Sequence, residues 1–251
     1  FYDDAKANVE FFLREGAAKN GLIEFGYYGD WLALEAMDKS QVTATAEIQA
    51  VSNVVEMASH LNKTDDVCVY NERLGALRRA YHQKYWNDTG AGSYAGGTQT
   101  ANLMPLILGI PPDAATRQRA AFAFVESVSA HAGNATKSGL VGASWVLQAL
   151  VAVNRSDVAL SMAMRETYPS WGYMLKEGPG TIWETWDDSS NSHNHPMFTA
   201  SIGPFLYAIV GLDPATWTIP TLLRRRRQRK EVSRDGAGGR EMEDHDDITM
   251  H

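Results

Sequence analysis

Cysteine is almost absent from this chain, because Cys68 is the only one among 251 residues. A single cysteine excludes a disulfide within the chain and any zinc site that needs several thiolates. Paired histidines at the spacing of metal ligands are missing too, so neither a metal nor another cofactor is expected. No apolar run reaches the roughly 20 residues that a membrane-spanning helix needs. The sequence therefore predicts no membrane partner.

The start of the chain lacks a methionine and also lacks the basic and then apolar leader of a secreted protein. We therefore expect a truncated chain. N-glycosylation motifs nevertheless stand in or near predicted turns, which favours an extracellular over a cytoplasmic location. Their acceptor residues are Asn62, Asn87, Asn134 and Asn154.

Positive charge is scarce before the C-terminal segment. The formal net charge is −7, and residues 221–251 hold eight basic and seven acidic residues, which leaves 15 basic against 23 acidic residues before them. Phosphate binding requires a basic surface, so nucleic acid is not an expected partner. Residues 215–251 carry many charges and few apolar side chains, and we predict a disordered charged tail there. The oligomeric state stays open.

Strands are rare as well, and helical periodicity dominates residues 1–214. Hydrophobic residues make up 44% of the chain, enough for a sizeable core. Loops of unequal length join the helices in pairs without a fixed repeat length, which predicts an all-α domain built as a closed ring of helical hairpins. The expected helices are 1–19, 41–61, 72–85, 99–108, 114–130, 141–153, 157–166 and 195–210, with strand pieces near 23–27 and 92–95.

One stretch combines the side chains that a sugar-binding site needs. Trp183, Glu184 and Trp186 stand together, and His193 and His195 follow a few residues later. Indole faces stack on the C–H patches of a sugar ring, a carboxylate can activate a water, and imidazoles bind hydroxyl groups. Turn-forming residues on both sides predict a loop, where functional residues commonly lie. The stretch indicates carbohydrate chemistry.

Structural explanations compete with this interpretation. The two tryptophans can be core anchors, His193 a solvated loop residue, and His195 a residue that stabilises the start of the last helix. Glu184 is the hardest to explain in this way, because a carboxylate between indoles gains nothing structural without a partner.

An ordered series of short stretches resembles the catalytic domain of the inverting α-L-rhamnosidases, which is an (α/α)6 barrel. The resemblance covers about residues 1–214 and the C-terminal half of that domain. It implies an incomplete (α/α)6 toroid of helical hairpins that hydrolyses terminal α-L-rhamnose from glycosides or polysaccharides with inversion. The matching stretches are residues 29–32, 98–101, 166–174, 181–187 and 192–198.

The same resemblance implies roles for individual residues. Glu184 would be the general base that activates a water at the anomeric carbon. Asp30 has a structural alternative, the N-cap of a helix that begins at Trp31. The substrate-binding residues that the resemblance implies are Asp30, Trp31, Trp183, Trp186 and His195.

The general acid is the missing partner of this site. In the rhamnosidases it lies in an acidic motif that does not occur in this chain, and an inverting hydrolase needs both carboxyl groups. A fragment without the acid can be inactive on its own. Two other functions stay open, another six-hairpin glycosidase and a carbohydrate-binding remnant that has lost catalysis.

Overall fold

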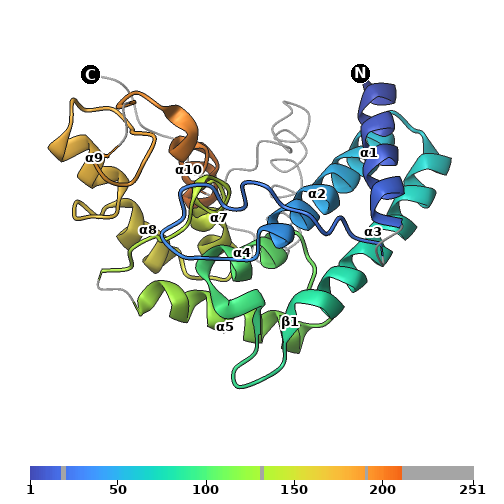
Figure 1. The fold of residues 1–251 in the computed structure, drawn as a ribbon, viewed down its shortest axis with the longest axis horizontal. Helices are drawn as coiled ribbons and strands as arrows, with labels where there is room; N and C mark the ends of the chain where they lie inside the picture. Colours follow the sequence, from blue (N-terminus) through green and yellow to red (C-terminus); the bar gives the residue numbers. More distant parts are fainter. Residues whose placement is uncertain (18–20, 131–132, 190–191, 211–251) are drawn as a thin grey trace, which may run out of the picture. The chain divides into compact units, whose positions relative to one another are not determined.

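The computed structural model describes residues 1–17, 21–130, 133–189 and 192–210. Residues Phe1–Ile209 form one unit, which is shown in Figure 1. The predicted tail at residues 215–251 lies outside the described residues. The predicted all-α class is confirmed, with the helices α1 (Tyr2–Ala17), α2 (Lys39–His60), α3 (Thr64–Tyr85), α4 (Gln99–Ile107), α5 (Ala114–Ser129), α6 (Leu140–Ala143), α7 (Val146–Ala152), α8 (Ser156–Ala163), α9 (Trp171–Glu177) and α10 (Ile202–Ile209).

The helices pack in pairs, each with a more buried and a more exposed member. Helix α2 packs on α3, α4 on α5, and α7 on α8. Eight of the nine residues of α4 are buried, against four of the sixteen in α5. Helix α4 also contacts α2, α6 and α7, so the buried helices form an inner row. This alternation of inner and outer helices is what the predicted ring of hairpins requires.

Short polar side chains start several helices. Each accepts a hydrogen bond from a backbone N–H in the first turn, which satisfies a donor that the helix itself cannot. The residues at the starts of α2, α4, α5 and α9 are Asp38, Thr98, Asp113 and Ser170.

Three of the four sequon asparagines adopt a left-handed backbone conformation. The φ angles of Asn62, Asn134 and Asn154 are 55°, 56° and 60°. Asn62 follows the end of α2 and Asn154 the end of α7. A left-handed residue commonly ends a helix, and asparagine tolerates that conformation better than most residues.

Helix α3 begins at Thr64, eight residues before the predicted start at residue 72. Asp65 and Asp66 occupy its first turn, where carboxylates favour the positive end of the helix dipole. Of the eight additional residues only Tyr70 is buried. The apolar periodicity is therefore too weak in that stretch to reveal the helix.

The predicted helix at residues 141–153 is wrong in one respect, since it is broken into α6 and α7. Trp145 lies between the two with φ −124° and ψ −13°, outside the helical region. The predicted helix at 195–210 is likewise two pieces, a 3-10 helix, η2 (Pro196–Thr199), and then α10. Helix α9 forms within a stretch that was predicted to be a loop.

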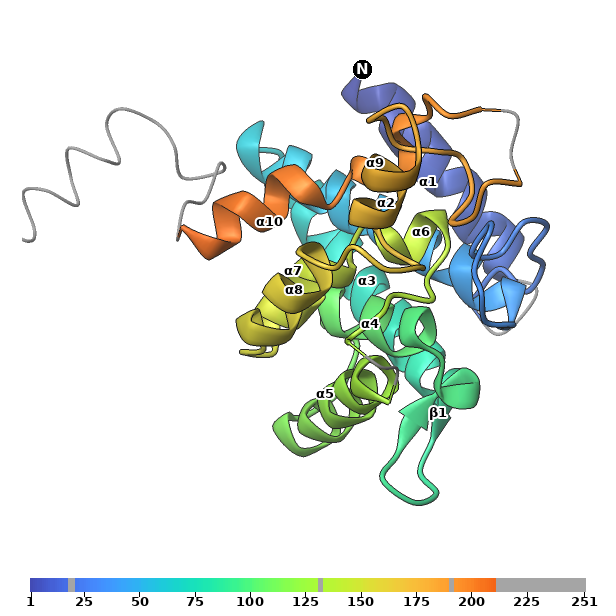
Figure 2. The ribbon, with the colours of Figure 1, turned by 90° about the vertical axis from the view of Figure 1, so that its left-hand side faces the viewer.

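Of the two predicted strand pieces, one exists. β2 (Ser93–Tyr94) pairs antiparallel with β1 (Trp86–Asn87), and this hairpin lies beside α5 (Figures 1 and 2). A short 3-10 helix, η1 (Ala95–Gly97), follows it. The prediction of a strand near 23–27 is wrong, because this stretch has no regular secondary structure.

Candidate active site

The loop after α9 folds back on itself and brings two predicted site residues onto facing arms. The amide of Glu184 donates to the carbonyl of Ser192 at 3.0 Å, and the amide of His195 donates to the carbonyl of Ile182 at 2.7 Å. The hydroxyl of Thr181 donates to the carbonyl of His193. Backbone hydrogen bonds therefore hold Glu184 and His195 on paired arms, and we call the described residues 181–189 and 192–195 the site loop.

The Glu184 carboxylate has no hydrogen-bond or ion-pair partner within the part of the chain that the structure describes, and its side chain is half-buried. Nδ1 of His195 is buried and also lacks a partner there. Polar groups in such positions normally find partners. The site loop therefore carries two groups whose hydrogen-bonding capacity is open to a ligand.

Trp183 and Trp186 lie in the core, each only 1% exposed. Trp186 packs against Trp171 and Phe198, with ring centroids at 5.5 and 4.2 Å, and its Nε1 donates to the carbonyl of Ser138 at 2.8 Å. Neither indole has a face open to a sugar, which departs from the expectation that both would wall the site. The burial supports the competing explanation that they are core anchors.

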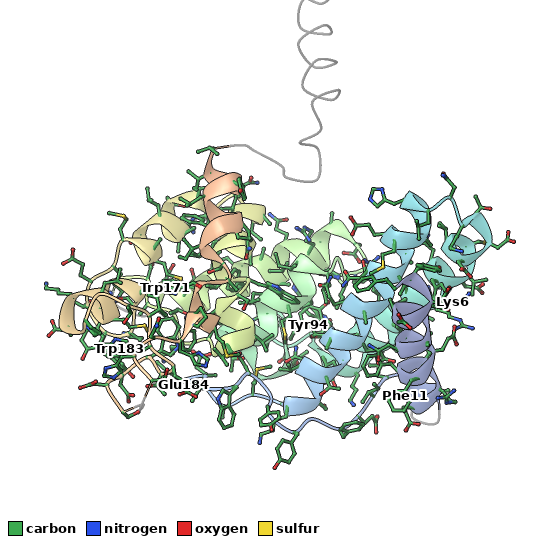
Figure 3. The ribbon with its side chains drawn as sticks, turned by 90° about the horizontal axis from the view of Figure 1, so that it is seen from above. Lys6, Phe11, Tyr94, Trp171, Trp183 and Glu184 are labelled. Carbon is green, nitrogen blue, oxygen red and sulfur yellow. The ribbon has the colours of Figure 1, made fainter. Side chains whose placement is uncertain are left out.

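The buried ring of Trp183 packs against side chains of the site loop and of α9. Its ring stacks on His193 at a centroid distance of 4.7 Å and meets the edge of Tyr173 at 5.9 Å. Gly178 allows this packing, because a Cβ atom there would lie 2.5 Å from Cζ2 of the indole. Figure 3 shows Trp183 and Glu184 at the same end of the unit as Trp171, and Lys6 and Phe11 at the other end.

His193 is a partly exposed loop residue, and its ring also makes specific contacts. Besides its stacking on Trp183, its Nε2 lies 2.9 Å from Oδ1 of Asp188, an ion pair when the imidazole is protonated. Asp187 forms the turn that the sequence predicts, with Oδ1 accepting from the amide of Ser189 at 3.1 Å. His195 stands at the start of η2, but its side chain makes no capping hydrogen bond.

Asp30 lies in the interior and is 6% exposed. One carboxylate oxygen accepts from Thr100 Oγ1 at 2.5 Å and from the amide of Gly139 at 2.7 Å. The other accepts from the amides of Val141 and Gly142 at 2.9 and 3.1 Å. No helix begins at Trp31, so the suggested cap is wrong, and Asp30 instead caps α6 from a distant part of the chain.

Burial raises the pKa of the Asp30 carboxyl above its ordinary value, because the charged form loses its hydration. The hydrogen bond from Thr100 and those from the amides of Gly142, Gly139 and Val141 oppose this rise. All four donors are directed at the carboxylate, so its capacity to bind a sugar hydroxyl is largely used.

The segment 137–140 connects the Asp30 region with the site loop. The amide of Leu140 donates to the carbonyl of Trp31 at 2.8 Å, and the amide of Leu34 donates to the carbonyl of Lys137 at 2.9 Å. Between them, Ser138 accepts the hydrogen bond of the Trp186 indole. Asp30 and Trp31 on one side and the site loop on the other therefore share this segment. Sequence reasoning missed it, since nothing in its composition marks it.

Trp31 is the predicted site residue with an accessible ring. Its side chain is 47% exposed, and Tyr28 contacts it edge to face at 5.5 Å. Its ring can therefore stack on a ligand, as the two buried indoles cannot.

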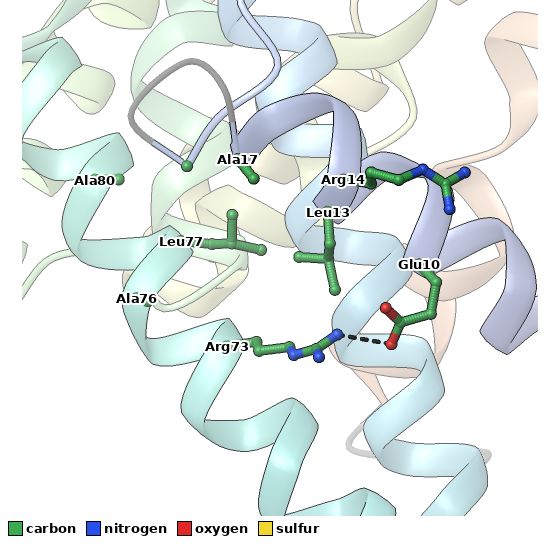
Figure 4. A pocket seen from close by; sticks show the side chains of 9 residues that line it. Glu10, Leu13, Arg14, Ala17, Arg73, Ala76, Leu77 and Ala80 are labelled. Carbon is green, nitrogen blue, oxygen red and sulfur yellow. Dashed lines mark hydrogen bonds and ion pairs between the residues drawn. The ribbon is translucent and has the colours of Figure 1, made fainter.

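A hollow of about 550 Å³ lies elsewhere in the unit, between α1 and α3 (Figure 4). Leu13 and Leu77 point toward one another across it, and the ion pair of Glu10 and Arg73, 2.6 Å between Oε1 and Nη1, closes one end. None of the predicted site residues lines it. Its apolar floor and its distance from the site loop in sequence separate it from the candidate active site.

Within the described ranges, no group of three His, Cys, Asp or Glu side chains is arranged to hold a metal ion. Among the same residues, no helix combines the length and the apolar character that crossing a bilayer requires.

Known proteins match this chain over most of its length. The α-L-rhamnosidase of Streptomyces avermitilis is 31% identical over 199 residues, which are 74% of this chain and 19% of that protein. An α-L-rhamnosidase of Alteromonas sp. is 24% identical over 80% of this chain and 24% of its own length. The chain thus spans about a fifth to a quarter of the length of these relatives.

Solved structures agree with the sequence relatives. The crystal structure of the Streptomyces avermitilis α-L-rhamnosidase complexed with L-rhamnose superposes with a TM-score of 0.73 at 28% identity, covering 82% of this chain and 21% of that one. The α-L-rhamnosidase from Dictyoglumus thermophilum gives 0.74 at 26% identity, covering 82% and 24%. The family model of the bacterial α-L-rhamnosidase six-hairpin glycosidase domain matches residues 1–210. The chain therefore belongs to the family of α-L-rhamnosidase six-hairpin glycosidase domains, as part of the catalytic domain.

Proposed function

We propose that this chain forms the base-bearing part of an active site that hydrolyses terminal α-L-rhamnosides with inversion, and that Glu184 is the general base. The observation that carries the proposal is the carboxylate of Glu184, which has no partner among the described residues and stands on a loop held by backbone hydrogen bonds and buried indoles. The relative from Streptomyces avermitilis, whose structure contains L-rhamnose, supports the choice of sugar.

The proposed chemistry needs two carboxyl groups. A base deprotonates a water that attacks the anomeric carbon, while an acid protonates the leaving oxygen, and the two groups stand roughly 6.5–9.5 Å apart in inverting enzymes. Asp30 is not the acid in this proposal, because four donors hold its buried carboxylate. The family's acidic motif is absent from the chain, so we assign the acid to another part of the catalytic domain.

The remaining predicted residues take different roles in the proposal. His195 lies three residues after Ser192, whose carbonyl accepts from the Glu184 amide, and its Nδ1 lacks a partner among the described residues. In the proposal this imidazole binds sugar hydroxyls. Trp31 offers its exposed ring to the apolar face of the sugar. Asp30 acts as a positioning residue, since it ties the backbone beside Trp31 to α6. Trp183 and Trp186 support the site loop from the core.

The proposal is tested by the complete protein and the variant Glu184→Gln. We expect the wild type to release rhamnose from an aryl α-L-rhamnoside, and the first-formed product seen by NMR to be the β-anomer. Glu184→Gln should lose turnover by about 10²–10⁴-fold, because the base is gone, and keep rhamnose binding. Azide added to Glu184→Ala should form a β-rhamnosyl azide, since a small anion can replace the activated water.

Other outcomes select the competing functions. Unchanged turnover in Glu184→Gln rejects the base assignment, and an α-anomeric first product rejects inversion. Rhamnose binding without any hydrolysis by the complete protein would identify a carbohydrate-binding remnant. Faster hydrolysis of a different glycoside would identify another six-hairpin glycosidase.

A further inference from the structure

Three aromatic side chains beside the candidate active site are exposed to solvent. Tyr27 is 79% exposed and Tyr28 64%, and Trp31 follows them in the same loop. The ring centroids of Tyr27 and Tyr28 are 4.7 Å apart at an interplanar angle of 81°, and those of Tyr28 and Trp31 are 5.5 Å apart at 89°. These three rings form a continuous series that begins at Trp31 and ends at Tyr27. We call it the aromatic row.

The backbone below the aromatic row is closely packed. A Cβ atom at Gly26 would lie 2.2 Å from the carbonyl oxygen of Lys39, and one at Gly29 would lie 2.9 Å from Cγ of the same lysine. Nζ of Lys39 donates to the carbonyl of Tyr27 at 3.2 Å. Two glycines thus allow the loop to lie directly on the start of α2. The rings are exposed although the backbone that carries them is fixed, which is typical of binding residues on a rigid scaffold.

The aromatic row is continuous with the candidate active site. The carbonyl of Trp31 accepts from the amide of Leu140, two residues from Ser138, which accepts from the Trp186 indole of the site loop. The carboxylate of Asp30, next to Trp31, binds the same segment. A substrate whose sugar ring lies on Trp31 therefore reaches Tyr28 with its neighbouring group.

The chemistry of the aromatic row favours an aromatic group there. Neither tyrosine hydroxyl nor the Trp31 indole N–H has a hydrogen-bond partner within the described residues. The charged groups beside the row are engaged, Lys39 with a carbonyl and Asp30 with its four donors. A second sugar would need several donors and acceptors to replace the hydration of its hydroxyls. A planar aromatic ring needs only faces and edges on which to stack.

We infer that the aromatic row binds an aromatic leaving group of the substrate and that Tyr28 sets the preference for aryl over alkyl rhamnosides. This inference rests on the proposed function, because it places the leaving group next to a rhamnose ring at Trp31. It adds two residues, Tyr27 and Tyr28, that the sequence motifs did not single out.

The test compares two rhamnosides in the complete protein, one with a naphthyl and one with a trifluoroethyl leaving group. Both leaving groups are activated, but only the naphthyl group can stack. We expect Tyr28→Ala to lower the ratio of kcat/KM, naphthyl over trifluoroethyl, by about threefold to tenfold, as the loss of one aromatic contact implies. Tyr28→Phe keeps the ring and should keep the ratio. Phe122→Ala removes another exposed ring, on α5, and should change neither rate.

A wild-type ratio in Tyr28→Ala overturns the inference while the proposed function stands. An equal loss on both substrates also overturns it, because Tyr28 then serves folding or sugar binding in general. If the wild type hydrolyses neither compound, the proposed function is rejected independently of the inference about the aromatic row. Binding of the naphthyl rhamnoside, followed by its fluorescence, then decides the role of the row: equal affinity of wild type and Tyr28→Ala rejects it.

Discussion

The amide of Gly139 donates a hydrogen bond of 2.7 Å to the carboxylate of Asp30, 109 positions earlier in the chain. Thr100 and the amides of Val141 and Gly142 donate to the same group. One side chain thus joins the loop before α2, the inner helix α4 and the start of α6. These four hydrogen bonds are structural contacts, in a region where the sequence motif suggests contact with substrate.

We predict that Asp30→Asn destabilises the protein by about 2–4 kcal/mol. The new NH₂ group would face donors, and at least one buried N–H would lose its acceptor. Urea unfolding measures the effect, and Asp3→Asn, an exposed change in the first turn of α1, serves as the control. If Asp30→Asn lowers the free energy of unfolding no more than the control does, the buried N–H groups do not need the carboxylate as their acceptor.

Glu47 makes stability depend on pH. Its side chain is 1% exposed, Oε2 accepts from the amide of Ile23 at 3.1 Å, and Oε1 lacks a partner among the described residues. Burial raises the pKa of Glu47 from 4.5 to about 7, against the opposing effect of the Ile23 bond. Between these pH values the folded state therefore binds more protons than the unfolded state. The contribution of protonated Glu47 to the free energy of unfolding is complete below pH 4.5 and is lost as the pH rises to about 7.

Glu47→Gln should remove that pH dependence, because an amide does not ionise. At pH 8 we expect the variant to be more stable than the wild type by about 2 kcal/mol, and near pH 4.5 to differ little. Denaturant unfolding across this range measures it. The control Glu72→Gln changes an exposed carboxyl on α3 and should leave the pH profile as it is. A wild-type slope in Glu47→Gln would assign the pH dependence to other groups.

Trp186→Phe should cost more stability than Trp183→Phe, although both indoles are equally buried. Trp186 donates to the carbonyl of Ser138, which the phenylalanine would leave unpaired, whereas Nε1 of Trp183 has no partner to lose among the residues that the structure describes. We expect a difference of about 1–2 kcal/mol in the free energy of unfolding. Equal losses would mean that volume alone determines the effect at both positions.

We expect the substitution of glycine by alanine to have opposite effects on stability at Gly142 and at Gly203. A Cβ atom at Gly142 would lie 2.1 Å from Oγ1 of Thr100, the hydroxyl that binds Asp30, while one at Gly203 in α10 meets no atom of the described residues within 4 Å. Gly142→Ala should therefore destabilise by about 1–3 kcal/mol. Gly203→Ala should stabilise by up to about 1 kcal/mol, because alanine favours the helix. Thermal unfolding distinguishes the two directions.

Much of the fold was predictable because it depends on local patterns. The apolar periodicity of α2, α4 and α5 locates these helices to within about two residues. The capping of α6 by Asp30 was not predictable, since this contact spans more than a hundred residues. Helix α9 was missed because Gly172 and the preceding proline indicate a loop.

The candidate site was predictable in part. The composition of the stretch around Glu184 locates the site loop, but burial of the two indoles depends on packing against Trp171 and Phe198, which the spacing of tryptophans does not reveal. The segment 137–140 carries no distinctive side chain and acts through its backbone. Such contributions are visible only in three dimensions. The roles of Glu184 and His195 stay predictions.

The left-handed asparagines have a consequence for experiments on glycan attachment. The usual replacement by glutamine at Asn62, Asn134 or Asn154 would remove an acceptor and also force a longer side chain into a conformation that it disfavours. A loss of yield or secretion in such a variant would then confound sugar attachment with chain geometry. Glycine at the same positions removes the acceptor without the strain, and so tests glycan attachment apart from chain geometry.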